Sequence, residues 1–327
     1  MKKLGARSST SDVLQGKDLT GRTVVITGSN CGIGFETAQA LAGAGAKVIF
    51  ACRNIEKGEE ALRRCKALHP KSKLAFFPLD LASVDSIKHF CGEVKSEAID
   101  TLICNAGLMP TNYQETKEGL EMTVGVCHFG HFLLTQLLLP QLLTAKAPRV
   151  VMLSSESHRM PAKLNFNKFP LTKTDRFSAL TAYGQAKLCN ALFANELQRR
   201  FEYKGLTACS LHPGALITTS FGRDSGFLSL VFKLVSPLTK NPNQGAATTV
   251  YCASHENAEE LAGKYFSHCK PVRSTKEANN PETAKKLWEV SEEWRRGLQL
   301  YNESNRHIVR TMSGWNHYEN YLAFNRN

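Results

Sequence analysis

Residues 23–34 read Thr-Val-Val-Ile-Thr-Gly-Ser-Asn-Cys-Gly-Ile-Gly, and this stretch decides the fold of the chain. Its first four residues are all β-branched, which is typical of a buried strand. Glycines follow, and an alanine-rich helical pattern then continues to Ala44. A strand, a glycine-rich turn and a helix in this order let backbone amides approach a pyrophosphate at the helix N-terminus. We therefore predict a dinucleotide-binding turn, with a tight turn that binds nothing as the alternative; its residues are Gly28, Ser29, Asn30, Gly32, Ile33 and Gly34.

A second strand is predicted over residues 46–51, and Cys52, Arg53 and Asn54 follow it. Folds that bind NAD usually place an acidic residue near the end of this strand, where it holds the ribose 2′-hydroxyl. Here Arg53 occupies that region, and a guanidinium suits a 2′-phosphate because it can bind in a bidentate manner. The sequence therefore favours NADP(H) over NAD(H), and the alternative is that Arg53 is only a surface group after the strand.

A third strand is predicted over residues 73–79, and it ends in Asp80 and Leu81. Asp80 either bonds an adenine edge or satisfies loop amides, and we place Leu81 beside it in the cofactor site. Ser83 then resembles an N-cap for a helix over residues 84–96.

The next apolar run, residues 99–104, ends in Asn105, Ala106 and Gly107. Small residues at the end of a strand let the backbone pass under a cofactor, so we assign these three to the cofactor site. The alternation of strands and helices predicts an α/β fold, a Rossmann-like doubly wound parallel sheet with three α/β/α layers in a single domain.

A long helical pattern over residues 120–145, which Pro140 would interrupt, precedes another buried strand over residues 149–153. In an open α/β sheet the ligand crevice lies outside the carboxyl ends of the strands. Ser155, just after this strand, should therefore face the same crevice as the glycine turn and hold a substrate oxygen through its hydroxyl. Ser154 is the alternative. We interpret His158 as a loop residue, because no G-x-S-x-G elbow of a hydrolase surrounds these serines.

Tyr183 and Lys187 lie four residues apart at the start of a helical pattern, so both side chains should project from one face of the helix. A phenol alone titrates near pH ~10 and is a poor acid or base at neutral pH. A cation one turn away should lower its pKa toward the working range. Tyr183 can then act as a general acid or base that Lys187 tunes. An ordinary exposed helix is the alternative, since this spacing is common.

The remaining chain continues the alternation. A strand over residues 207–211 ends before Pro213 and Gly214, whose backbone either bounds a nicotinamide pocket or makes a simple turn. Residues 226–235 form an apolar segment that we interpret as a lid over an apolar substrate, a surface that touches lipid, or core packing. A helix, a short strand and an amphipathic helix complete the pattern, over residues 244–253, 263–266 and 281–297.

The composition is that of a soluble globular protein, with 42% hydrophobic and 21% charged residues. The ten cysteines show no C-x-x-C pair and no zinc spacing, so we expect free thiols, no metal site and a reducing, cytoplasmic location. We expect neither a membrane span nor a secretory signal. The net charge of +12 suggests phosphate-bearing partners, but the basic residues come in pairs without a nucleic-acid motif. Nucleic-acid binding is therefore only a distant hypothesis.

Three segments describe the predicted organisation. Residues 1–20 form a flexible lead-in, residues 21–297 the catalytic domain, and residues 298–327 a C-terminal tail to which we assign no role.

Taken in order, the motifs resemble those of the classical short-chain dehydrogenases/reductases. They are Thr27-Gly28-x3-Gly32-x-Gly34, Asn105-Ala106-Gly107, Ser155, Tyr183-x3-Lys187 and Pro213-Gly214. Residues 14–18, 51–54, 154–159 and 244–251 are similar to the branch that contains WW-domain-containing oxidoreductase and retinol-dehydrogenase-like proteins, although we expect no WW domain here.

The resemblance implies an NADP(H)-dependent oxidoreductase that interconverts an alcohol and a carbonyl on an apolar substrate, such as a retinoid, steroid or lipid aldehyde. It implies that Tyr183 donates or accepts the proton and that Lys187 binds the nicotinamide ribose and lowers the pKa of Tyr183. Ser155 would hold the substrate oxygen, and Arg53 matches the position that these relatives use for NADP-type cofactors. A homodimer formed through the two long helices beside the active site is also a family expectation.

One departure from the pattern affects the functional prediction. The branch usually reads Asn-His-x-Gly-His-Phe in the helix after the fourth strand, and that Asn supports a proton-relay water. Here Cys127 takes its place, and a thiol is a weak hydrogen-bonding group. Turnover is then slowed, or another group takes over. The second hypothesis is therefore a catalytically weak cofactor-binding scaffold or regulatory protein of the same fold.

Overall fold

The computed structural model describes residues 3–214 and 241–308, with side chains described as far as residue 298. The apolar segment 226–235 lies outside the described residues, so its predicted roles stay predictions. The chain divides into two units, Met1–Trp288 and Glu289–Asn327. The predicted end of the domain at residue 297 falls inside a helix, α10, which spans Pro281–Ile308.

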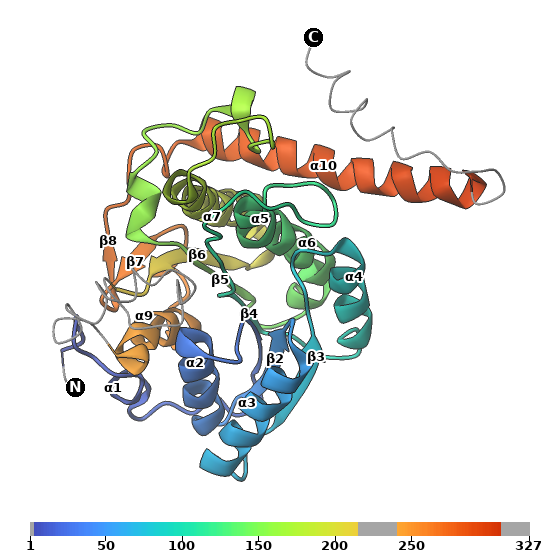
Figure 1. Ribbon diagram of the computed structural model, residues 1–327. Coiled ribbons are helices and arrows are strands. Elements are labelled where there is room, and N and C mark those ends of the chain that lie inside the picture. The colour runs from blue at the N-terminus through green and yellow to red at the C-terminus, as the bar shows by residue number, and fades with distance from the viewer. Residues whose placement is uncertain (1–2, 215–240, 309–327) are drawn as a thin grey trace. The chain divides into compact units, whose positions relative to one another are not determined.

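An eight-stranded sheet forms the middle layer of the first unit (Figure 1). The strand order is β3-β2-β1-β4-β5-β6-β7-β8, and every pair is parallel except β7 with β8. The strands are β1 Thr23–Thr27, β2 Lys47–Cys52, β3 Leu74–Pro78, β4 Thr101–Cys104, β5 Arg149–Leu153, β6 Thr207–His212, β7 Tyr265–Ser267 and β8 Lys270–Val272. This confirms the predicted doubly wound α/β fold. The strand order reverses between β1 and β4, so a ligand crevice is expected at their carboxyl ends.

Helices cover both faces of the sheet (Figure 1). One face carries α1 Thr10–Leu14, α2 Gly32–Gly43, α3 Ile55–Leu68 and α9 Pro242–Ser254. The other carries α4 Val84–Glu93, α5 Met122–Val124, α6 His131–Leu142 and α7 Ala179–Phe201. The inner strands read as unbroken apolar runs because both of their faces are buried.

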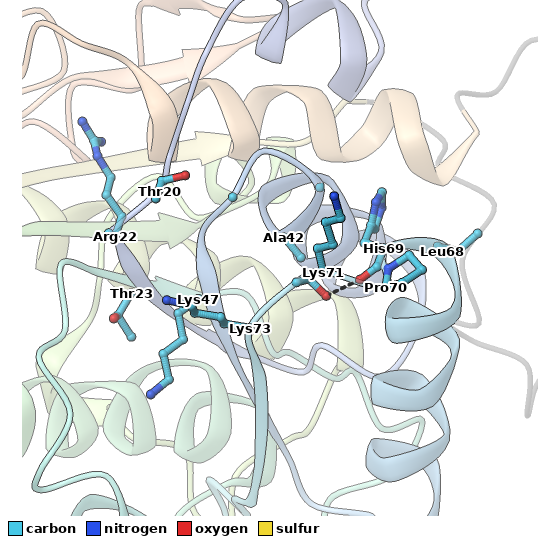
Figure 2. Close-up of a pocket in the computed structure, with 14 residues that line it drawn as sticks. Thr20, Arg22, Thr23, Ala42, Lys47, Leu68, His69, Pro70, Lys71 and Lys73 are labelled. Carbon is cyan, nitrogen blue, oxygen red and sulfur yellow. Dashed lines mark hydrogen bonds between the residues drawn. The ribbon is translucent and has the colours of Figure 1, made fainter.

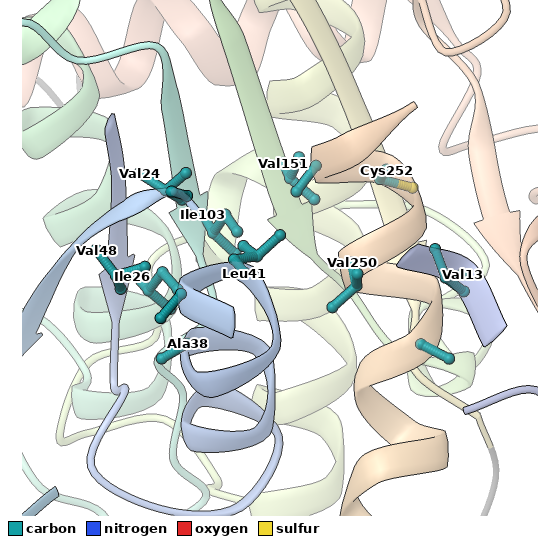
Figure 3. Packing of buried hydrophobic residues seen from close by; sticks show 14 of the residues in the cluster. Val13, Val24, Ile26, Ala38, Leu41, Val48, Ile103, Val151, Val250 and Cys252 are labelled. Carbon is teal, nitrogen blue, oxygen red and sulfur yellow. The ribbon is translucent and has the colours of Figure 1, made fainter. Parts of the chain in front are cut away.

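Buried side chains from one face of the central strands form the core under α2 and α9 (Figure 3). Ile26 of β1, Ile103 of β4 and Val151 of β5 pack with Leu41 of α2 in one cluster. Val25 is fully buried as well, but it lies outside this cluster because successive side chains of a strand point to opposite faces.

Part of the predicted flexible lead-in is helical and packed. Ser9 caps α1 with a complete capping box, and Val13 is buried in the core cluster. The backbone N–H of Thr10 donates to Asn243 Oδ1 of α9 at 3.1 Å. Residues 9–14 therefore belong to the packed body of the first unit.

The long helix predicted over residues 120–145 is not continuous α-helix. A π-helical segment, Gly125–Gly130, separates α5 from α6, while Pro140 is accommodated inside α6. Among the described residues, Met122–Leu142 is the one stretch long and apolar enough to cross a membrane, with mean hydropathy 1.4, but 83% of its apolar window is buried inside the protein. That burial is the pattern of a core helix.

Candidate active site

The glycine turn sits at the carboxyl end of β1, beside the point where the strand order reverses. Gly28 and Gly32 have φ of 64° and 56°, in the left-handed region that favours glycine. A Cβ on Gly34 would lie 2.2 Å from the carbonyl oxygen of Gly28, so α2 can approach the turn this closely only with glycine there. The turn therefore brings the first amides of α2 against the crevice.

The N-terminus of α2 differs from those of its neighbours. Asn54, Ser83 and Ser178 cap α3, α4 and α7 through their side-chain oxygens. The N-cap of α2 is Cys31, whose side chain makes no capping hydrogen bond. The orphan amides of a helix N-terminus attract an anion. This donor set fits a dinucleotide pyrophosphate, which these amides together with those of the glycine turn would hold.

The side chains of the turn differ in their placement. Ser29 is fully buried, and its Oγ accepts the N–H of Ala51 at 3.2 Å, so only its backbone can reach a cofactor. Asn30 and Ile33 are half-buried, and Ile33 packs against the core cluster. Arg53 is exposed just beyond β2, which pairs with β1 through Thr27 and Ala51. Arg53 therefore directly follows the strand that pairs with β1, and its side chain is exposed.

Asp80 satisfies a loop amide, as one of the two interpretations of the sequence expects. Its Oδ1 accepts the N–H of Ala82 at 3.0 Å, and its own N–H donates to Ser86 Oγ at 2.9 Å. Leu81 is buried against the π-helix, since a Cβ on Gly130 would lie 2.4 Å from the Leu81 carbonyl oxygen.

Residues Asn105–Gly107 connect the glycine turn to the second half of the site. Asn105 Nδ2 donates to the carbonyls of Thr27 and Gly28, at 2.8 and 3.2 Å. Thr27 Oγ1 in turn accepts the N–H groups of Asn105 and Ala106, each at 2.9 Å. A Cβ on Gly107 would lie 3.2 Å from Lys187 Nζ and 3.4 Å from Cys127 Sγ. A residue without a side chain is needed at position 107 because side chains of α7 and of the π-helix Gly125–Gly130 come this close to it.

Tyr183, Lys187 and Ser155 converge from two elements. The Ser155 side chain is hydrogen-bonded to the phenol of Tyr183. Lys187 Nζ lies 5.4 Å from the centre of the Tyr183 ring and donates to the carbonyl of Leu153 at 3.0 Å. Asn190, one turn further along α7, donates to the same carbonyl at 2.9 Å. The helical spacing of Tyr183, Lys187 and Asn190 could have identified this third residue from the sequence.

Ser154 and Ser155 face different ways. Ser154 is buried, and its Oγ donates to the backbone carbonyl of Lys187 at 2.7 Å. It therefore ties β5 to α7. Ser155 is half-buried, caps the 3₁₀ turn Glu156–Arg159 and contacts the phenol.

The electrostatics of Tyr183 differ from the sequence expectation. Burial raises the pKa of the phenol above its usual value, and this outweighs the lowering by the Lys187 ammonium and the Ser155 hydrogen bond. Lys187 lowers the pKa of Tyr183, as expected, but the larger effect of burial leaves this pKa above its usual value and not in the neutral range. The phenol stays protonated at neutral pH and is a proton donor.

His158 lies in the 3₁₀ turn and not in an open loop. Its ring is buried, with Nδ1 against the Ser155 carbonyl at 2.5 Å and Nε2 against Ser274 Oγ at 3.1 Å. Burial lowers its pKa, so the ring is neutral and fixes the turn. At the end of β6, Gly214 has φ of 123°, and Pro213 beside it is half-buried.

A concavity of about 720 Å³ lies at the opposite, amino-terminal edge of β1, β2 and β3 (Figure 2). Its lining includes Arg22, Lys47 and Lys73, and Lys47 is paired with Glu97 at 2.5 Å. None of the predicted site residues lines it. The chemistry-bearing residues are at the carboxyl ends of the strands, so this concavity is not the active site.

Comparison with known proteins agrees with this geometry. A family model described as short chain dehydrogenase matches residues 22–167. The WW domain-containing oxidoreductase of Gallus gallus is 43% identical over 298 residues, which cover 89% of this chain and 72% of that protein. Retinol dehydrogenase 12 of Mus musculus is 43% identical over 275 residues, covering 84% of this chain and 86% of that protein.

Solved structures share the fold. An uncharacterized protein from Mycobacterium paratuberculosis superimposes with a TM-score of 0.69 at 33% identity, covering 86% of this chain and 96% of that one. A Shigella flexneri protein described as a short chain dehydrogenase in complex with NADP gives a TM-score of 0.59 at 22% identity, covering 76% and 98%. The chain belongs to the short-chain dehydrogenase/reductase family, in the branch of WW domain-containing oxidoreductase and the retinol dehydrogenases. It is an NAD(P)-dependent oxidoreductase that acts on a small molecule.

Proposed function

We propose that the chain is an NADP(H)-dependent oxidoreductase that interconverts a carbonyl and an alcohol on an apolar substrate, with Tyr183 as the general acid/base. The observation that carries the proposal is the hydrogen-bonded pair of Tyr183 and Ser155, with Lys187 beside the phenol and next to Gly107. Gly107 belongs to the segment that holds the glycine turn. The same edge of the sheet therefore carries Tyr183 as the proton donor, Ser155 as the hydroxyl that binds the substrate oxygen, and the glycine turn that binds the cofactor.

The proton chemistry follows from the burial of the site. Bound nicotinamide supplies or accepts the hydride. Ser155 Oγ and the Tyr183 phenol can both bond the carbonyl oxygen and polarise it, and the protonated phenol then neutralises the developing alkoxide. Because burial raises the pKa of Tyr183, the protonated form required for carbonyl reduction is the one present at neutral pH.

Apolar side chains near the site support an apolar substrate. Leu180 lies one turn before Tyr183 on α7 and is 56% exposed. Tyr113, in the loop after β4, meets Phe177, just before α7, edge to face with ring centres 5.9 Å apart. Met160 is 54% exposed. With the named activity of the retinol dehydrogenase relatives, these groups favour a retinoid, steroid or lipid aldehyde.

Arg53 is the residue proposed to select the phosphorylated cofactor. We expect wild-type protein to bind NADPH at least about tenfold more tightly than NADH, because a bidentate guanidinium–phosphate contact is strong. Arg53→Ala should weaken NADPH binding about tenfold and leave NADH binding unchanged. Titration by nicotinamide fluorescence measures both constants. Equal affinity for NADPH and NADH in the wild-type protein would refute the assignment.

The substrate class is tested by nicotinamide absorbance with a carbonyl panel of all-trans-retinal, nonanal and androstenedione. We expect carbonyl-dependent oxidation of NADPH with at least one of these. If NADPH is oxidised in the presence of polar sugars or keto acids but with none of these three carbonyls, the apolar-substrate assignment is contradicted.

Cys127 supports a second candidate function, a catalytically weak cofactor-binding scaffold or regulatory protein. Its thiol is buried close to Lys187, at the Gly107 end of the site. A thiol is a weak hydrogen-bonding group, so it supports a proton relay poorly. Cys127→Asn discriminates between the two functions: a gain of about a hundredfold in rate would favour the scaffold, while an unchanged or lower rate favours the enzyme.

All ten cysteines are free thiols. This supports the proposal of a reducing, cytoplasmic location. The proposed homodimer is tested by sedimentation equilibrium of the full chain, where a monomer mass at micromolar concentration would refute it.

A further inference from the structure

We propose that Ser157 passes protons to Tyr183 through Ser155. The hydroxyls of Ser157, Ser155 and Tyr183 would then form a chain that returns a proton to the Tyr183 phenolate after each turnover. The proposal rests on the proposed function, because it needs Tyr183 to lose a proton during catalysis. It assigns a role to a residue outside the cofactor and substrate contacts.

The three hydroxyls are contiguous. The Ser155 side chain is hydrogen-bonded to the Tyr183 phenol, and Ser155 Oγ donates to Ser157 Oγ at 3.3 Å. Ser155 Oγ also accepts the backbone N–H of Ser157 at 3.2 Å, which fixes its position between the other two oxygens. Ser157 is half-buried, so part of this residue lies at the protein surface. Catalytic hydrogen bonds of this length in a free enzyme commonly shorten in the working complex.

A route for protons to Tyr183 by way of Lys187 is less favourable than the route through the serines. Lys187 Nζ is buried and donates to the carbonyl of Leu153, which can only accept. Its neighbours toward the crevice are Gly107, which has no side chain, and Cys127, whose thiol is a weak donor. The serine side, by contrast, consists of groups that both donate and accept.

The surroundings hold the relay rigid. His158 fixes the turn by contacts with the Ser155 carbonyl and Ser274 Oγ. A Cβ on Gly184, next to Tyr183, would lie 2.9 Å from the Ser157 carbonyl oxygen, so α7 packs directly on the turn. A glycine at this position lets the phenol and the serine turn approach each other.

The proton transfers balance. Tyr183 breaks its O–H bond when its proton passes to the oxygen of the reduced carbonyl, and a phenolate remains. The Ser155 and Ser157 hydroxyls first rotate, because Ser155 donates to Ser157 in the structure and delivery of a proton to the phenolate needs the opposite direction. Ser155 then gives its proton to the phenolate, Ser157 gives its proton to Ser155, and Ser157 takes one from water. The three transfers are concerted, so no serine alkoxide forms. The sum is one proton moved from solvent to the product alcohol.

Ser157→Ala tests the relay, using the fastest carbonyl of the panel above. Tyr183 starts protonated, so the first turnover on enzyme loaded with NADPH should keep its wild-type rate, while kcat falls about tenfold or more. KM should fall by about the same factor as kcat, because the steps up to hydride transfer, which set kcat/KM, are unchanged. Imidazole buffer should restore kcat by delivering protons directly, and Ser157→Thr, which keeps the hydroxyl, should retain it. Ser274→Ala is the matched control, because it alters the same turn outside the hydroxyl chain.

The outcomes separate the two proposals. An unchanged kcat in Ser157→Ala overturns the relay. So does a loss that slows the first turnover equally and is not rescued by imidazole, since that pattern indicates a structural role. If Tyr183→Phe instead shows a normal first turnover, the proposed function fails, and the relay fails with it.

Discussion

Two adjacent serines show how one residue step changes a role. Ser154 directly follows β5 and is buried. Its hydroxyl donates a hydrogen bond to the backbone carbonyl of Lys187. Ser155 begins the 3₁₀ turn, and its hydroxyl faces the phenol. The sequence pair Ser-Ser alone does not say which hydroxyl faces the crevice, because the answer depends on where the strand ends.

Alanine variants of the two serines should therefore separate stability from rate. Each loses a hydrogen bond and should cost about 0.5–1.5 kcal/mol of unfolding free energy. Ser155→Ala should also lower the rate about a hundredfold or more, because the substrate oxygen loses a preorganised donor. Ser154→Ala should change it less than about tenfold. Urea unfolding and NADPH oxidation measure the two effects, and equal rate losses would contradict the assignment of Ser155.

At the scale of elements, the π-helix Gly125–Gly130 fits closely against the loop after β3. Gly130 lies against the backbone of Leu81, and Gly125 against the side chain of Thr116. The wider π-helical turn also carries Cys127 and leads into His131, whose Nε2 is 2.9 Å from Thr27 Oγ1. This element thus joins the end of β1 to the active-site helices.

Gly130→Ala should destabilise the protein by about 1–3 kcal/mol, because the new Cβ would lie 2.4 Å from the Leu81 carbonyl oxygen. Gly92→Ala is the matched control. Gly92 is exposed in α4, and no atom lies within 4 Å of the position that an alanine methyl would take, so alanine there should stabilise by about 0.5–1 kcal/mol. The denaturation midpoints of the two variants should shift in opposite directions from that of the wild type. A shift of both midpoints in the same direction would contradict this packing.

The strands and the order of the motifs could be predicted from the sequence because they depend on local patterns. Apolar β-branched runs mark buried strands, and glycines or small residues mark the turns after them. The predicted helix over residues 120–145 was wrong in detail, because residues 125–130 are π-helical. This segment packs closely against Leu81, a tertiary contact that the local sequence pattern does not contain. Strand β8 was missed, since a three-residue edge strand leaves no alternation to detect.

The site shows the same limit. The spacing of Tyr183 and Lys187 predicts that they share a helix face, but the pKa of the phenol depends on how deeply the whole protein buries it. Ser157 carries no motif of its own, and its placement follows from the packing of α7 on the turn after β5.

At the scale of the whole molecule, buried neutral histidines link stability to pH. Burial lowers the pKa of His128 to about 3 and that of His131 to about 4. The unfolded chain binds protons at these residues below pH ~6.5, and the folded chain does not until much lower pH. Stability is therefore fully present above pH ~6.5 and falls as the pH drops toward 4, by about 1.4 kcal/mol per pH unit for each residue.

The variant His128→Phe tests this linkage, because the ring already packs among Phe129, Phe132 and Phe193. Urea unfolding at pH 7, 6 and 5 should give a steep loss of stability in the wild type, and a slope smaller by about one proton in the variant. Identical slopes would mean that His128 is not kept neutral by burial.

The central claim is that Tyr183 supplies the proton for an oxidoreductase reaction at the carboxyl edge of the sheet. The most direct measurement is the rate of carbonyl-dependent NADPH oxidation by Tyr183→Phe relative to wild type, at saturating cofactor. Phenylalanine keeps the ring beside Lys187 and removes only the hydroxyl. The account predicts a loss of about a thousandfold or more with NADPH affinity retained. A variant that oxidises NADPH at the wild-type rate would contradict it.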